Sequence, residues 1–92
     1  MTSILETRWQ ISGDAVDNAV GDEVVILHLT NGTYFGLDAV GALLWRGLKA
    51  GETPLMVRDR ILDAYDVDQE TAEKDLAKFM HELIDGQLIT PC

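Results

Sequence analysis

The sequence predicts an α+β fold, in which a small three-stranded antiparallel sheet is followed by three helices. Short segments rich in β-branched and aromatic residues lie before Asp38 and are separated by glycine-containing turns. After Asp38 the apolar residues recur at helical spacing instead. A chain of 92 residues suits one domain with a modest core, so we expect a single domain over residues 1–92.

The clearest strand covers residues 23–30, whose run from Val24 to Leu29 is too apolar to be half-exposed. This strand is therefore expected at the centre of the sheet. Residues 9–12 and 15–20 are less regular candidates. Asn31-Gly32 predicts a two-residue hairpin turn, in which both residues need positive φ. The next strand, 33–37, has no obvious successor, so it is expected at a sheet edge, where unpaired backbone groups invite another chain to pair.

The first helix is predicted from an apolar stripe at four-residue spacing, formed by Val40, Leu44 and Leu48. Trp45, in the middle of this helix, is expected in the core. The expected N-caps of the three helices are Asp38, Thr53 and Asp68. Gly51 and Gly86 are the expected stops of the first and third helices. Helices packed on one face of a small sheet resemble a winged helix-turn-helix.

The charge of the chain disfavours nucleic acid and anionic membranes as partners. Sixteen acidic and seven basic residues give a net charge of −9. Winged helices commonly place their last helix in the DNA major groove. Here residues 68–85 hold more acids than lysines, and such a surface would repel phosphates. The shape of the fold therefore favours a DNA-binding regulator, whereas the charge opposes one.

Catalytic and metal-binding motifs are missing from the sequence. His28 and His81 have no second histidine or cysteine at ligand spacing. Cys92 is the single cysteine, and a nucleophile would need a neighbouring base. We therefore expect neither an enzyme nor a bound metal or cofactor. The sequence shows no apolar run long enough to span a membrane and no signal peptide, so a cytoplasmic location is expected.

Two sets of residues are candidates for binding. Tyr34 and Phe35 point to opposite faces of their strand, and the sequence leaves open which of them faces a binding groove. Asp75, Phe79 and Glu82 share one flank of the third helix. That flank is either a solvated edge with Phe79 buried, or the wall of a groove beside the edge strand.

The assembled pattern resembles the PqqD-like family, whose members recognise precursors of ribosomally made, modified peptides (RiPPs). The resemblance covers roughly residues 8–90. It rests on Gly21-Asp-Glu-Val-Val-Ile-Leu-His-Leu, Thr33-Tyr-Phe-Gly-Leu-Asp-Ala-Val-Gly-Ala-Leu-Leu-Trp45, Tyr65-Asp-Val, Asp75-Leu-Ala-Lys-Phe-Met80 and Leu83-Ile-Asp-Gly-Gln-Leu-Ile89. The combination of the aromatic–aromatic–Gly–Leu–Asp strand end, the helix tryptophan and the Asp-x-x-x-Phe pattern is fairly specific.

The resemblance implies a noncatalytic domain in which a precursor's leader peptide docks as an added antiparallel strand between the last strand and the last helix. The implied peptide-binding residues are Thr33, Tyr34, Phe35, Gly36, Leu37, Asp75, Lys78, Phe79 and Glu82. Stand-alone, acidic members look most like the leader-binding proteins of lasso peptide biosynthesis, whose partner is a separate cysteine protease that removes the leader. The alternatives are a PQQ-type peptide chaperone for a radical SAM enzyme, a winged-helix DNA-binding regulator, and an assembly subunit whose edge strand pairs with itself.

Overall fold

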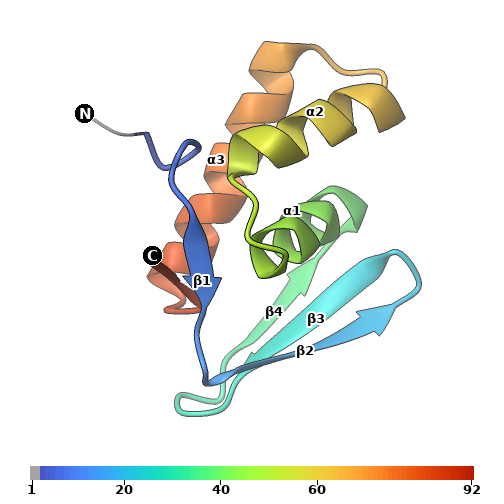
Figure 1. Cartoon of the computed structure of the whole chain (residues 1–92). Coiled ribbons are helices and arrows are strands. Elements are labelled where there is room, and N and C mark those ends of the chain that lie inside the picture. The colour runs from blue at the N-terminus through green and yellow to red at the C-terminus, as the bar shows by residue number, and fades with distance from the viewer. Residues whose placement is uncertain (1–2) are drawn as a thin grey trace.

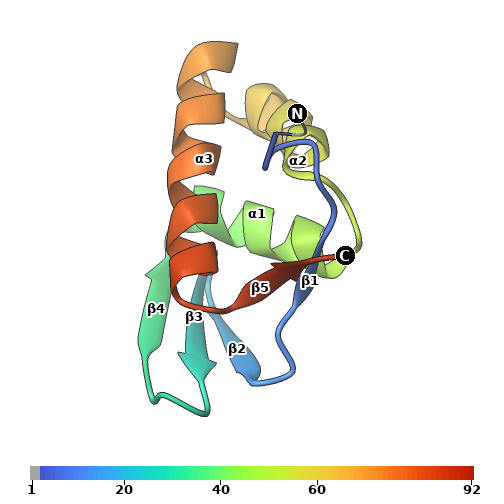
Figure 2. The ribbon, with the colours of Figure 1, turned by 90° about the vertical axis from the view of Figure 1, so that its left-hand side faces the viewer.

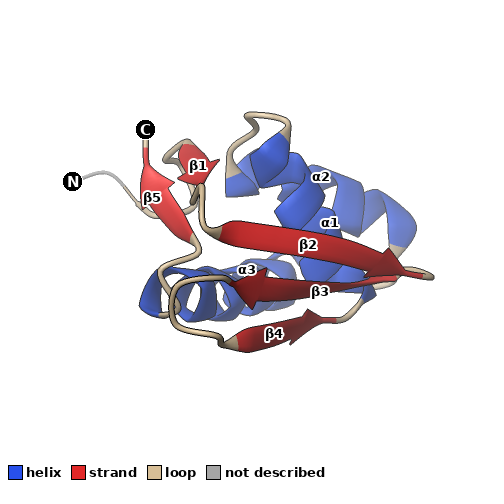
Figure 3. Ribbon diagram, turned by 90° about the horizontal axis from the view of Figure 1, so that it is seen from below, coloured by secondary structure: helices blue, strands red, loops and turns tan. Residues whose placement is uncertain are grey.

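The computed structural model describes residues 3–92; the first two residues of the predicted 1–92 domain lie outside this range. A three-stranded antiparallel sheet precedes three helices, which confirms the predicted fold class (Figure 1). The sheet has the order β2–β3–β4, and the helices lie on one of its faces (Figure 3). The elements are β1 (Trp9–Ile11), β2 (Ala15–Val20), β3 (Glu23–His28), β4 (Tyr34–Leu37), α1 (Ala39–Lys49), α2 (Pro54–Ala64), α3 (Gln69–Asp85) and β5 (Ile89–Pro91).

A second, two-stranded sheet joins the two ends of the domain, and the sequence did not predict it. β1 pairs antiparallel with β5, with Trp9 opposite Pro91 and Ile11 opposite Ile89 (Figure 2). Trp9 and Ile89 are buried in the common core. The residues that follow the third helix therefore form a strand, β5, that holds β1 against the helices.

β3 is the central strand, as predicted, but only one of its faces is buried. Val24, Ile26 and His28 point into the core, whereas Val25 is 37% exposed on the other face. The expectation that this strand is too apolar to be half-exposed is therefore wrong. No helix of residues 3–92 covers the outer face of β2–β3–β4 (Figure 3), so an antiparallel sheet with one open face explains the pattern.

The turn between β3 and β4 is longer than the two-residue hairpin predicted from Asn31-Gly32. Gly32 has φ +71, but Asn31 is not among the residues with positive φ. The His28 N–H donates to the Thr33 carbonyl at 2.9 Å, which leaves a loop of residues 29–32. Such loops are usually built around a type I turn and need only one left-handed residue, here Gly32.

The predicted N-caps are confirmed. The carboxylates of Asp38 and Asp68 accept hydrogen bonds from backbone N–H groups in the first turns of α1 and α3, at 2.9 and 2.7 Å. Thr53 caps α2 in the same way. Gly51, with φ +84, follows the end of α1. At the end of α3, however, the left-handed residue is Gln87 (φ 60) and not Gly86, which keeps a right-handed conformation.

Trp45 is in the core, as predicted, and it also ties α1 to the sheet. Its side chain is 1% exposed, and its indole N–H donates to a carboxylate oxygen of Asp17 on β2 at 2.5 Å. The Lys49 ammonium lies 2.7 Å from the same oxygen. The polar residue that interrupts the apolar pattern of β2 is therefore the partner of a buried tryptophan.

This contact should make stability depend on pH. The hydrogen bond from Lys49, followed by that from Trp45, lowers the pKa of Asp17 below its ordinary value of 3.8. Because the pKa is lower in the folded state, the contact stabilises the fold above the unfolded pKa and is lost as the pH falls through the folded value. Since Lys49 is half-exposed, we expect a contribution below about 1 kcal/mol.

Urea denaturation at about pH 6 and about pH 3 measures this contribution, because at the lower pH the unfolded chain binds more protons at Asp17 than the folded protein does. The free energy of unfolding should fall more in the wild type than in Asp17→Asn, whose amide oxygen can still accept from Trp45. Other carboxylates titrate in both proteins and cancel in the comparison. An equal fall in the two proteins would contradict the assignment.

Candidate functional site

β4 is an outermost strand of its sheet, and successive residues of β4 turn their backbone N–H and C=O groups alternately toward β3 and away from it. Because the His28 N–H bonds to the Thr33 carbonyl, the alternation of antiparallel pairs directs the backbone groups of Phe35 and Leu37 toward β3. The N–H and C=O groups of Tyr34 and Gly36 then face away from β3. The free edge therefore offers the main chain of two residues, Tyr34 and Gly36, to an incoming strand.

An open hollow of about 600 Å³ lies between this edge and the C-terminal end of α3. Figure 2 shows β4 next to that end of the helix. The hollow is lined by residues of β4 with its preceding turn and by residues of the last turn of α3: Asn31, Thr33, Tyr34, Phe35, Gly36, Glu82, Asp85 and Gly86. A peptide strand added to β4 would therefore run along this hollow.

Two aromatic rings fix the distance between β4, α1 and α3, and each ring packs against a glycine. A Cβ atom on Gly86 would lie 2.3 Å from Cζ of Phe35, so the half-buried Phe35 ring occupies the space that a side chain would need. Phe79 of α3 packs in the same manner against Gly41 of α1, where a Cβ would lie 2.9 Å from its ring. Phe35 thus closes the floor of the hollow, and Phe79 packs beyond it, near Leu37.

The helix side of the hollow is acidic. Glu82 and Asp85 are exposed, and neither takes part in an ion pair within residues 3–92. The hollow is lined by no lysine or arginine among the described residues. Its electrostatics favour a cationic or neutral occupant over an anionic one.

The structure brings together five of the nine residues that the family resemblance implied. Four of them come from one segment and one from α3: Thr33, Tyr34, Phe35, Gly36 and Glu82 all line the hollow. Leu37 is buried at 3% exposure. Asp75, Lys78 and Phe79 lie nearer the N-terminus of α3 and do not line the hollow.

The side chains of Tyr34 and Phe35 point to opposite faces of β4, and only that of Phe35 points toward α3. Phe35 faces inward, against Gly86 at the end of α3, whereas the Tyr34 side chain is 70% exposed on the open face of the sheet. The sequence interpretation missed Asn31, Asp85 and Gly86 as lining residues. Asp85 lies three residues beyond Glu82, so helical spacing could have indicated it; the other two were understood only as turn residues.

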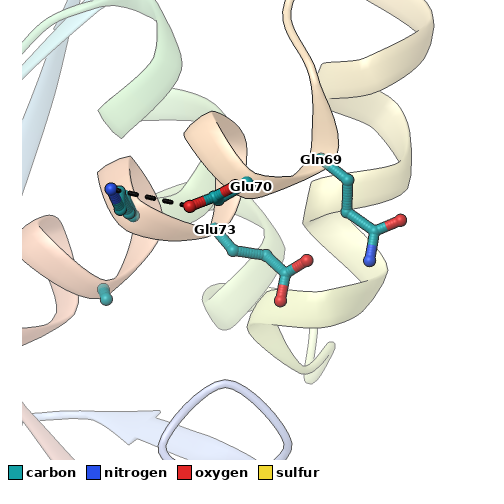
Figure 4. Close-up of a pocket in the computed structure, with 5 residues that line it drawn as sticks. Gln69, Glu70 and Glu73 are labelled. Atoms are coloured by element: carbon teal, nitrogen blue, oxygen red, sulfur yellow. Dashed lines mark ion pairs between the residues drawn. The ribbon is translucent and has the colours of Figure 1, made fainter.

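Other features of the surface offer less. A second hollow, of about 490 Å³, lies over the first turns of α3, where Glu70 and Lys74 form an ion pair at 3.7 Å (Figure 4). Both of these side chains are largely exposed, so the hollow is a solvated helix face. Within residues 3–92, no group of three His, Cys, Asp or Glu side chains is placed to hold a metal ion. None of the helices in the described part of the chain is long and apolar enough to cross a membrane.

Comparison with known proteins gives two similar solved structures. One is TbiB1 in complex with the TbiA(beta) leader peptide, which is 45% identical, with 87% of this chain and 93% of that chain covered and a TM-score of 0.80. The other is lasso peptide synthetase B1 complexed with the leader peptide, which is 23% identical. The match covers 91% of this chain and 99% of that chain, with a TM-score of 0.82. At this level of identity the match supports the fold alone. No curated protein matches the chain.

The family comparison agrees with the architecture. The model of coenzyme PQQ synthesis protein D (PqqD) matches residues 23–89, from the central strand through all three helices to the first residue of β5. This range includes the free edge of β4 and the helix wall beside it. The chain therefore belongs to the PqqD family.

Proposed function

We propose that this chain is a noncatalytic recognition domain, spanning residues 1–92, that binds the leader peptide of a ribosomally made precursor. The resemblance of the sequence to the stand-alone leader-binding proteins of lasso peptide biosynthesis favours a lasso peptide as the product of that precursor. The leader docks as an antiparallel strand on β4 and lies between β4 and α3. The bound precursor is then presented to a separate leader peptidase, a cysteine protease, and to the other maturation enzymes of the pathway.

The observation that carries this proposal is the free edge of β4 beside an open hollow. An edge strand binds a peptide through main-chain hydrogen bonds, and pockets that receive alternate side chains give selectivity. The 45% identical TbiB1 was solved with a leader peptide bound, which supports the same class of ligand here. The other candidate functions, a PQQ-type chaperone and a DNA-binding regulator, are not favoured by this relative.

The alternation of outward-facing backbone groups on β4 determines which side chains of the docked leader point toward α3 and which point to the open face of the sheet. Leader residues opposite Tyr34 and Gly36 bond to the free main-chain groups and send their side chains to the open face of the sheet. The residue opposite Phe35 sends its side chain toward α3, into the hollow. Leader residues are therefore read on alternate sides, one set against α3 and one set on the open face.

The direction of the docked strand follows from the antiparallel pairing. β4 begins beside the end of α3, where Phe35 meets Gly86, and it ends at Leu37, near Phe79. An antiparallel leader enters at Leu37 and leaves beside Glu82 and Asp85. We propose that the half-buried Phe79 favours apolar leader residues at the entry, while Glu82 and Asp85 favour a basic residue at the exit. Asp75 and Lys78, which are exposed one to three turns earlier on α3, would meet the leader before it enters the hollow.

Hydrogen exchange of single amides tests strand addition, with the TbiA(beta) leader peptide as the probe. The amides of Tyr34 and Gly36 should exchange rapidly in the free protein and slowly in the complex, because an added strand accepts their hydrogen bonds. The amides of Phe35 and Leu37 should be protected in both states, since they already donate to β3.

The opposite edge of the sheet supplies the control. The Leu29 N–H donates to the Asp14 carbonyl, so the same alternation leaves the Ala19 amide at the free edge of β2. Its exchange should not change when peptide is added. Peptide binding with no slowing at Tyr34 and Gly36, or with equal slowing at Ala19, would argue against docking on β4.

A further inference from the structure

No contact among the described residues explains why position 36 of β4 is a glycine. Glycine in the interior of a strand costs stability and usually marks a left-handed residue, a bulge, or a close approach by another molecule. Gly36 does not have a positive φ, and the pairing of β3 with β4 runs without interruption from Val24–Leu37 to Leu27–Tyr34. A Cβ atom on Gly36 would meet no atom of the described residues within 4 Å. Of the three explanations for a glycine at this position, close approach by another molecule is the one that remains.

The position of Gly36 shows where that approach occurs. Gly36 lies directly opposite Val25 in a pair that is not hydrogen-bonded, the closer of the two kinds of antiparallel pair. Its missing side chain would point to the open face of the sheet, next to the exposed ring of Tyr34. Val25 keeps 37% of its surface exposed there, although it belongs to the central strand. On the open face of the sheet, the space over Gly36 therefore lies between the side chains of Tyr34 and Val25.

We infer that Gly36 is a subsite on the open face of the sheet, which admits a large apolar side chain of the bound leader. This inference rests on the proposed function and extends it to the side of the strand away from α3. The leader residue paired with Gly36 projects its side chain onto the open face. Because Gly36 has no side chain, that group lies across the strand, beside Tyr34, and covers Val25.

The chemistry of this subsite selects apolar and preferably aromatic groups. The space is bordered by a phenol ring and an isopropyl group, and nearby Leu27 of β3 is only partly buried. An aromatic side chain that packs over a glycine in a neighbouring strand restores the cross-strand contact that the glycine lacks. Leader selectivity thus has two independent parts, the hollow against α3 and the subsite over Gly36.

The test compares Gly36→Val and Gly36→Ala with the wild type, using the TbiA(beta) leader peptide as the calorimetric probe. Both substitutions should leave Tm unchanged or raise it, because the new side chain meets no atom and valine favours strands. The affinity should fall about ten-fold or more with valine and less with alanine, as expected when an anchor loses its pocket. Wild-type affinity in a folded Gly36→Val would overturn the inference.

A matched pair of variants separates the side-chain subsite from a general effect on the sheet. Val25→Ser should weaken binding, whereas Val20→Ser, on the same face but at the far edge strand, should not. An alanine scan of the probe should then find one apolar residue whose loss costs affinity in the wild type but not in Val25→Ser. Equal losses in both proteins at every leader position would also overturn the subsite. Failure of the wild type to bind the probe at all would instead contradict the proposed function, and the inference would fall with it.

Discussion

Replacing Tyr34 by proline is expected to weaken leader binding by about 1–3 kcal/mol, or roughly 5- to 150-fold, while the domain stays folded. The substitution removes an N–H group that faces away from β3, so no hydrogen bond of the free protein is lost. Tyr34 is also the first residue of β4, a position where an edge strand tolerates proline. The docked leader, in contrast, would keep a carbonyl without a partner. Calorimetry with the TbiA(beta) leader peptide measures the loss.

Tyr34→Ala is the matched control for this experiment. It removes the same exposed ring but keeps the N–H group, so the difference between the two variants reports the main-chain bond alone. Thermal denaturation should show both variants folded. If Tyr34→Pro and Tyr34→Ala bind the leader with equal affinity, the leader does not accept a hydrogen bond from the Tyr34 N–H. The assignment of Tyr34 and Gly36 as the residues whose backbone groups face away from β3 is then wrong.

Trp45→Ala is expected to cost about 3–5 kcal/mol in the free energy of unfolding, the range for truncating a buried tryptophan. The side chain is 1% exposed, and its removal also leaves the Asp17 carboxylate without the indole N–H. Total stabilities of small domains are only about 5–15 kcal/mol, so this variant should be close to unfolded at 37 °C. Urea denaturation at 25 °C gives the difference.

Two further variants interpret the result. Trp45→Phe keeps much of the packing and loses the hydrogen bond, so it should lie between the wild type and Trp45→Ala. Met56→Ala removes a side chain that is 45% exposed and should change stability by less than about 1 kcal/mol. A Trp45→Ala protein as stable as Met56→Ala would mean that α1 is not anchored to the sheet through this residue.

Features that depend on neighbouring residues were predictable from the sequence. The N-caps at Asp38, Thr53 and Asp68 were correct, because a capping side chain reaches only the next turn of its own helix. The edge position of β4 was also correct, since no further strand follows it before the helices. The pairing of β1 with β5 was missed, because it depends on how the two ends of the domain meet around the helices.

The candidate site was predictable on its strand side and less so on its helix side. Helical spacing placed Phe79 and Glu82 on one flank of α3, but it could not say how far along α3 the strand β4 would lie. β4 meets the last turn, so Glu82 lines the hollow and Phe79 packs instead against Gly41. Gly86 was understood as a helix stop, whereas the left-handed residue is Gln87 and Gly86 makes room for the Phe35 ring.

The β1–β5 pair also has a consequence for the order of folding. The meander of β2, β3 and β4 closes short loops, whereas Trp9 and Pro91 come together across nearly the whole chain. Loop-closure entropy therefore favours early formation of the meander and late joining of the ends. The last turn of α3 leads into β5 through residues 86–88, so the docking of β5 adds the last constraint on this end of the helix. A nascent chain would thus present the edge of β4 before the acidic side of the hollow stands beside it.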